Sequence, residues 1–262
     1  MDFAKKLFSI FSPQPLKTSG AAESSDLRAH IRIRPAFDNV VFLESTTLHQ
    51  VKLIDISYGG AAILTSTQIN DDAPISFKLR AVDRFVELTA KPVHRRGQQL
   101  GLSFIHDKPD GLIFLRDIIE NMKSTASTTK IPHEMTKLEL QHLGAQVWRD
   151  DGPVDILFFP QGSGAKSGTP ASLTVCFRDG KDYYQVNISK GKIITSKSDQ
   201  DIDAPPHQAS NLMKTAHSID LDALRKTLYL FCGATDPELK KAFAPFAAEV
   251  LAQFNQNLRI VK

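Results

Sequence analysis

Residues 51–64 read Val-Lys-Leu-Ile-Asp-Ile-Ser-Tyr-Gly-Gly-Ala-Ala-Ile-Leu, and this stretch decides the fold of the first half of the chain. Its two apolar runs flank the turn-forming Tyr58-Gly59-Gly60, a pattern that predicts a β-hairpin. Similar short runs, separated by turn-forming residues, lie on both sides of it. The full set of predicted strands is 40–43, 51–56, 61–64, 75–79, 86–93 and 100–105. Six strands at this spacing predict a small antiparallel barrel, because a sheet that closes on itself leaves no exposed edge.

A helix is expected directly after the strands. Apolar residues recur at helical spacing from Leu112 to Met122, and Asp110 is the expected N-cap. We therefore expect residues 25–122 to form a mainly β domain, a six-stranded barrel with one closing helix.

The second half of the chain has a different pattern. Residues 123–133 begin with a stretch that has no apolar residue larger than alanine, and we predict a linker there. After a helix at 133–143, strand-like runs are followed by helical ones, which is typical of an α+β domain, here residues 134–262. The predicted strands are 154–159, 172–178, 183–188 and 192–196, and the predicted helices are 206–217, 220–232 and 236–257.

Residues 1–24 are expected to form a flexible segment that begins with a short amphipathic helix. Its apolar stripe lies opposite Lys5 and Lys6 and consists of Phe3, Leu7, Ile10 and Phe11. This stripe could pack on the protein itself, dock to a partner or contact a membrane surface. Packing on the protein itself is favoured, because isolated helices of this length are only marginally stable in water.

Composition excludes several classes of protein. The 262 residues are 42% hydrophobic and 23% charged, as in soluble globular proteins, and no stretch approaches the ~20 apolar residues of a membrane span. The N-terminus does not resemble a secretory signal, so we predict a cytoplasmic protein. With 32 Lys and Arg against 29 Asp and Glu, the net charge of +3 is too small to indicate a nucleic acid polymer as partner.

Neither the cysteines nor the histidines show the spacing of a metal or catalytic site. Cys176 and Cys232 are single and lack metal-ligand spacing. No acid–base or nucleophile constellation is present either, so we predict a protein that is not an enzyme and needs no cofactor.

The residues that indicate a ligand lie just before the first strand. Residues 28–35 read Arg-Ala-His-Ile-Arg-Ile-Arg-Pro. Because proline disfavours helical dihedrals at the preceding residue, we expect an extended segment with Arg28, His30, Arg32 and Arg34 on one face. Guanidinium groups bind phosphate bidentately and pair with the O6/N7 edge of guanine. The alternative is a solvated basic edge strand that binds nothing.

The hairpin offers complementary groups. Asp55 and Ser57 are two residues apart, so we expect their side chains on one face, with Ile54 and Ile56 in the core on the other. A carboxylate can accept hydrogen bonds from N1–H and N2–H₂ of guanine. The two glycines that follow allow positive φ and let a ligand approach the backbone closely. The alternative is a turn stabilised by the aspartate and the serine with nothing bound.

Together, these stretches resemble the PilZ domain family of bacterial cyclic di-GMP receptors. The family has two signatures, RxxxR before the barrel and [D/N]xSxxG on it. Here the signature residues are Arg28, Arg32, Asp55, Ser57 and Gly60. Residues 93–96 and 100–104 also resemble the last two strands of the family. The resemblance covers residues 25–122 and implies a binding module rather than an enzyme.

The resemblance also implies a role for each signature residue. Arg28 and Arg32 would bind the phosphates and guanine edges of cyclic di-GMP. Asp55 and Ser57 would hold a guanine, and Gly60 would leave room for it. Geometry adds four second-rank candidates, which are His30, Arg34, Gly59 and Arg95.

The predicted function is that of a cytoplasmic cyclic di-GMP effector. Ligand binding would order the arginine loop and change its contacts with the second domain or with a protein partner, which would bind through residues 134–262 or the N-terminal helix. One alternative is a PilZ-like barrel that binds no nucleotide and acts as a protein–protein interaction module. Another makes residues 134–262 an enzyme regulated by the barrel. Contact with a membrane surface is supported only by the apolar stripe and the two lysines of the N-terminal helix, Lys5 and Lys6.

Overall fold

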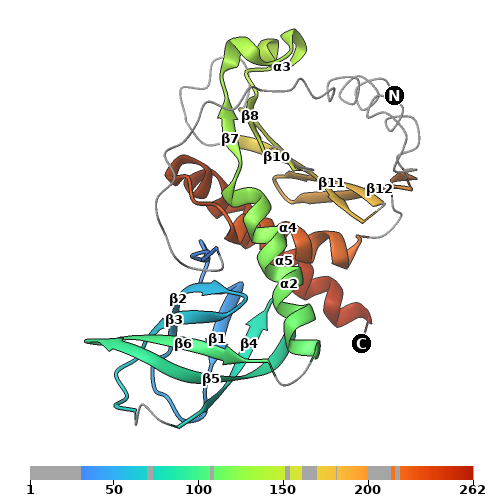
Figure 1. Cartoon of the computed structure of the whole chain (residues 1–262). Coiled ribbons are helices and arrows are strands. Elements are labelled where there is room, and N and C mark those ends of the chain that lie inside the picture. The colour runs from blue at the N-terminus through green and yellow to red at the C-terminus, as the bar shows by residue number, and fades with distance from the viewer. Residues whose placement is uncertain are drawn as a thin grey trace.

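Two antiparallel sheets with helices between them make up the described part of the chain (Figure 1). The computed structural model describes residues 31–69, 73–106, 109–150, 154–160, 170–180, 182–199, 214–215 and 219–261. The predicted N-terminal helix, Arg28, His30 and residues 206–213 of a predicted helix therefore lie outside the described residues.

The first sheet is the predicted six-stranded antiparallel barrel. Its strands pair in the order β1-β4-β5-β6-β3-β2. The barrel is therefore nearly closed, and its opening lies between β1 and β2, the two end strands of this order. Alternate residues of β4 are buried, as expected for a strand with one face on a core. The strands are β1 (Val41–Glu44), β2 (Lys52–Ser57), β3 (Gly60–Leu64), β4 (Ile75–Ala81), β5 (Arg84–Arg96) and β6 (Gln99–Ile105).

A β-bulge in β2 changes which residues enter the barrel core. Leu53 pairs with Ile63 and Asp55 pairs with Ala62, so Ile54 is the extra residue. Leu53 and Ile56 are buried, whereas Ile54 is only half-buried. The expectation that Ile54 enters the core was therefore wrong, because the bulge turns its side chain outward.

The helix α2 (Pro109–Ala126) closes the barrel and is longer than the sequence pattern predicted. Leu115, Ile118, Ile119 and Met122 are its fully buried apolar residues, one helix face at the expected spacing. The predicted linker range, 123–133, contains the last turn of this helix and then β7 (Thr129–Ile131).

The second sheet has seven antiparallel strands in the order β13-β12-β11-β10-β9-β8-β7. Four of them match the predicted runs, and three short strands were not predicted. Its further strands are β8 (Gln146–Arg149), β9 (Asp155–Pro160), β10 (Pro170–Asp179), β11 (Asp182–Ser189), β12 (Lys192–Asp199) and β13 (Lys214–Thr215).

Two of the predicted helices differ in the structure. The helix expected at 133–143 is divided into a 3₁₀ turn, η1 (His133–Met135), and a short helix, α3 (Leu138–His142). The prediction of a helix at 206–217 was wrong near its end, because residues 214–215 form β13 and pair with β12. Hydrogen bonding to an existing sheet edge outweighs the weak helical pattern there.

The last two helices match the sequence prediction. They are α4 (Leu221–Cys232) and α5 (Pro237–Val261). Asp220 caps α4, since its carboxylate accepts from the backbone N–H of Ala223 at 3.0 Å. None of the described helices combines the length and the apolar character that crossing a membrane requires.

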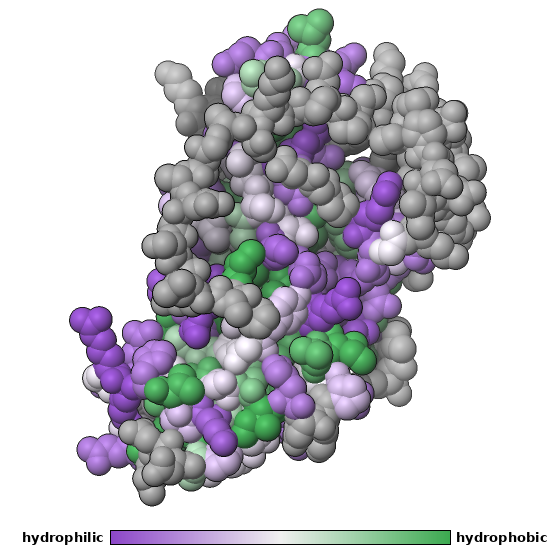
Figure 2. Space-filling view, in the orientation of Figure 1, coloured by the Kyte–Doolittle hydropathy of each residue, from purple (hydrophilic) through white to green (hydrophobic). Residues whose placement is uncertain are grey.

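The helices α2, α4 and α5 lie between the barrel and the second sheet (Figure 1). One hydrophobic cluster runs from the barrel through these helices into the sheet. Where α4 ends against α2, Gly233 is required: a Cβ there would lie 1.9 Å from the carbonyl oxygen of Met122. Two separately predicted halves therefore share a continuous core. Figure 2 shows that the visible described surface mixes hydrophilic side chains with separate hydrophobic patches.

Candidate functional site

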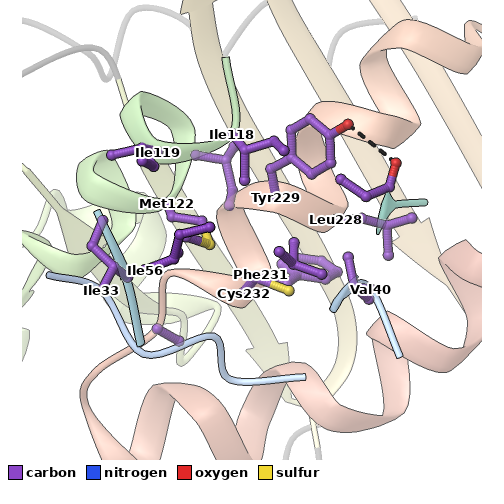
Figure 3. Packing of buried hydrophobic residues seen from close by; sticks show 14 of the residues in the cluster. Ile33, Val40, Ile56, Ile118, Ile119, Met122, Leu228, Tyr229, Phe231 and Cys232 are labelled. Carbon is purple, nitrogen blue, oxygen red and sulfur yellow. Dashed lines mark hydrogen bonds between the residues drawn. The ribbon is translucent and has the colours of Figure 1, made fainter. Parts of the chain in front are cut away.

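The two signature stretches lie side by side, joined by one β-bridge. Ile33 and Ile56 exchange both backbone hydrogen bonds, each at 2.9 Å. Both side chains are buried, and Figure 3 shows them next to Met122 of α2. In such an antiparallel pair, neighbouring side chains point to the opposite face, away from the core. Arg32 and Arg34 therefore share the outer face of this ladder with Asp55 and Ser57.

Arg32 and Asp55 form an ion pair on this face. The Nη1 of Arg32 donates to Oδ1 of Asp55 at 2.8 Å, and about a quarter of each side chain is exposed (25% and 24%). The pair thus combines access from solvent with reduced competition from water. Two of the residues expected to bind ligand are thus in direct side-chain contact.

Ser57 and Gly60 close the hairpin. The Ser57 hydroxyl is buried and donates to the Gly60 carbonyl at 3.2 Å. A Cβ on Gly60 would lie 2.0 Å from the carbonyl oxygen of Leu102 on β6. Gly60 is therefore required for the close pairing of β3 and β6, whatever it does for a ligand.

The hairpin glycines do not use the positive φ that glycine allows. Positive φ occurs at Gly97, Gly144, Gly180 and Gly191 among the described glycines, and at neither Gly59 nor Gly60. The two-residue turn is made without a left-handed glycine.

Tyr58, at the tip of the hairpin, contacts α2. Its hydroxyl donates to the Glu120 carboxylate, and a ring nitrogen of His106 contacts its backbone oxygen at 2.7 Å. Partial burial and the hydrogen bond to Glu120 raise the Tyr58 pKa to about 12. Sequence reasoning missed this contact, since nothing in the pattern links residues 62 positions apart.

The second-rank candidates are distributed unequally. Arg34 lies on the outer face beside Asp55. Arg95 lies on β5, separated from β2 by β6 and β3, and its Nε donates to the Gly97 carbonyl at 3.1 Å. The structure thus brings Arg34, but not Arg95, next to the signature residues.

The chain leaving the site is attached to α4. The N–H of Ala36 donates to the Cys232 carbonyl at 2.8 Å, and the Cys232 thiol contacts the Phe37 carbonyl at 3.7 Å. Burial raises the Cys232 pKa to about 12, so this thiol stays protonated at neutral pH. The segment that carries Arg32 and Arg34 is therefore fixed to the second half of the chain within four residues of the site.

The buried polar residues of the second sheet include a thiol next to a carboxylate. Cys176 pairs in register with Asp155, which binds Arg149 at 2.5 Å. Burial, followed by the Asp155 charge, raises the Cys176 pKa to about 12. A thiol held protonated in this way is a poor nucleophile. The described residues contain no group of three or more His, Cys, Asp or Glu side chains that could hold a metal ion.

Comparison with known proteins agrees with the barrel and its signatures. The family model described as "PilZ domain" matches residues 26–121. These residues form a PilZ domain. PilZ domains usually bind cyclic di-GMP and are typically receptor or adaptor domains rather than enzymes. The suspected family is thereby confirmed for this part of the chain.

Other comparisons add little. No curated protein matches the chain. The crystal structure of an uncharacterized Legionella protein is similar over 36% of this chain and 94% of its own, at 18% identity and a TM-score of 0.28.

Proposed function

We propose that this protein is a cytoplasmic cyclic di-GMP effector, in which the PilZ domain binds the dinucleotide and the second half of the chain conveys the signal. The observation that carries this proposal is the Ile33–Ile56 bridge, which places the Arg32 guanidinium 2.8 Å from the Asp55 carboxylate. An anion-binding and a guanine-binding group are thereby presented on one face.

The ion pair prepares both groups for ligand. Asp55 holds the Arg32 fork in place, and a guanidinium keeps donors free when one nitrogen is engaged. The ligand phosphate takes the free donors of Arg32, and the guanine N–H groups take the Asp55 carboxylate. Because the pair is partly exposed, rearranging it costs little free energy, about 1 kcal/mol or less.

The output follows from the position of the arginine segment. Ligand binding orders the arginine loop that leads into this segment, and the hydrogen bonds of Ala36 and Phe37 with Cys232 transmit the change to the end of α4. The changed contact between the barrel and α4 then alters the surface that the second sheet and its helices present to a protein partner. Partner binding, rather than catalysis, is the output of this scheme.

Calorimetric titration of the whole chain with cyclic di-GMP tests the proposal. We expect a micromolar dissociation constant, about −8 kcal/mol. Arg32→Ala and Asp55→Ala should each weaken binding about tenfold or more, since a bidentate arginine contact contributes about 1–3 kcal/mol. Arg96→Ala, an exposed arginine at the far end of β5, is the matched control and should bind as the wild type does.

Two results would contradict the proposal. One is a wild-type protein that gives no binding heat with cyclic di-GMP at concentrations up to the millimolar range. The other is an Arg32→Ala variant with unchanged affinity. The first result favours the interaction-module alternative, and the second removes Arg32 from the ligand site.

A further inference from the structure

A cavity of about 420 Å³ lies between the PilZ domain and α5, and its lining includes Arg34 and Ile54, which neighbour the signature residues in the chain. Its size is within the usual range of small-molecule sites. Residues of both halves of the chain line it. They include the cations Arg34, Lys52 and Lys240 and the apolar residues Leu53, Ile54 and Leu64.

The cavity carries uncompensated positive charge. Lys52 is paired with Asp38 at 2.7 Å, and both side chains are more than half exposed. Arg34 and Lys240 form no ion pair with any residue in the described ranges of the chain. Asp55, the acidic neighbour of Arg34 on the ladder, is engaged by Arg32. Two unpaired cations facing one cavity favour an anionic occupant.

The position of Lys240 is fixed by the start of α5. The Asp236 carboxylate accepts from the N–H groups of Glu238 and Leu239 at 2.7 and 2.9 Å. Leu239 is buried, so the first turn of the helix is anchored, and Lys240 next to it stays exposed. A lysine held at its backbone but free at its ammonium group suits the binding of a mobile anion.

The floor of the cavity is apolar. The β2 bulge turns Ile54 outward, and Leu64 on the neighbouring strand is 37% exposed. An apolar surface beside two free cations matches a ligand that combines a flat ring with phosphate. The same ligand class is indicated by Arg32 and Asp55 on the adjoining face.

We propose that Lys240 belongs to the ligand site, and that together with Arg34 it binds a phosphate of the dinucleotide held by Arg32 and Asp55. This inference rests on the proposed function and adds a contact from outside the PilZ domain. The bound ligand then joins the barrel to α5. Lys240 makes the site dependent on how the two halves are packed.

Titration of four proteins with cyclic di-GMP at low and moderate salt tests this inference. They are the wild type, Lys240→Ala, Lys240→Arg and Lys241→Ala. We expect Lys240→Ala to bind about threefold to tenfold more weakly and to lose part of the salt dependence, because one phosphate contact is removed. Lys240→Arg should retain most of the affinity. Lys241→Ala is the matched control: the same helix and charge, but no contact with the cavity.

The outcomes separate the two proposals. Equal affinity of Lys240→Ala and the wild type, with weak binding by Arg32→Ala, overturns the role of Lys240 and leaves the proposed function intact. Absence of binding by the wild type overturns both. Thermal unfolding of each free variant confirms that the change is in the site, since an exposed lysine should leave the midpoint unchanged.

Discussion

The N–H of Ala36 donates to the carbonyl of Cys232, which joins the segment before the barrel to the last residue of α4. Ala36 lies four residues after Arg32 and two after Arg34. Cys232 belongs to the same hydrophobic cluster as Ile33, Ile56 and Met122, part of which Figure 3 shows, so the signature residues and the helix interface share one packed region. A displacement of the arginine segment that reaches Ala36 therefore shifts or breaks a hydrogen bond to the end of α4.

Hydrogen exchange should detect this coupling. Saturating cyclic di-GMP is expected to slow exchange at residues 32–37 and also at the C-terminal amides of α4, because order gained in the segment is passed on through its hydrogen bonds. Mass spectrometry of the free and the ligand-bound chain measures the change, with Arg32→Ala as control. Protection confined to the pocket would count against the proposed output.

The Arg32–Asp55 pair should matter for binding and little for stability. Its side chains are partly exposed, so Arg32→Ala and Asp55→Ala should each change the free energy of unfolding by about 1 kcal/mol or less. Urea denaturation measures this change. A loss of several kcal/mol would show that the pair is a structural element of the barrel rather than part of a ligand site.

Gly60→Ala should destabilise the barrel. The added Cβ would meet the Leu102 carbonyl at 2.0 Å, and the two strands would have to separate. We expect a loss of about 3 kcal/mol in urea denaturation, the upper range for overpacking. At Gly97, where no atom lies within 4 Å, the same substitution should cost only the strain of its positive φ, about 1–2 kcal/mol. Equal losses at the two sites would contradict the assigned role of Gly60.

Arg225 makes a largely buried polar contact across the junction between the two halves. Its guanidinium is largely buried and binds both carboxylate oxygens of Asp83, at 2.8 and 3.2 Å. Arg225→Ala leaves the Asp83 charge without its partner and should cost about 3 kcal/mol. Arg84→Ala removes a half-exposed arginine from the same junction and should cost about 1 kcal/mol or less. Chemical denaturation distinguishes the two, and equal effects would contradict the argument.

We expect the four tyrosines to ionise at a higher pH than tyrosines in an unfolded chain. Burial raises the pKa of Tyr58 to about 12 and moves those of Tyr183, Tyr184 and Tyr229 in the same direction. The folded protein should therefore show little tyrosinate absorbance at pH 10, where unfolded tyrosines are about half ionised.

The same shifts fix the sign of the stability change. A native pKa above the unfolded value means that the folded state holds its proton more tightly. The resulting stability is fully present below pH 10 and is lost as the pH rises toward 12. Denaturation measured at pH 8, 10 and 11 checks this. Between pH 8 and pH 11, the free energy of unfolding should fall less for Tyr58→Phe than for the wild type. Stability that increases over this interval would contradict the argument.

The barrel could be predicted from sequence because its strands carry their own signal. Each strand alternates apolar with polar residues or contains a short apolar run, and glycine or asparagine occurs at the turns. The family signatures predicted that Arg32 and Asp55 lie close together. The alternation of side chains in an extended segment predicted that Arg34 lies on the same face as Arg32. Local patterns of two to six residues are sufficient for these features.

Features set by distant contacts could not be predicted. The bulge at Ile54 depends on how β2 fits β3, and β13 has only two residues, held by pairing with β12. Asp83 and Arg225 are 142 positions apart, and Lys240 reaches the cavity only through the packing of α5. No periodicity in the chain carries such information.

The unbroken apolar interior has a practical consequence for protein engineering that would attach the PilZ domain to another protein. Cutting after α2 would remove α4, which packs against α2, and would expose to water the apolar surface that α4 covers in the shared core. Such a fragment should aggregate or stick to chaperones. Transfer of residues 26–121 to another protein would therefore require α4 and α5 to be transferred with them.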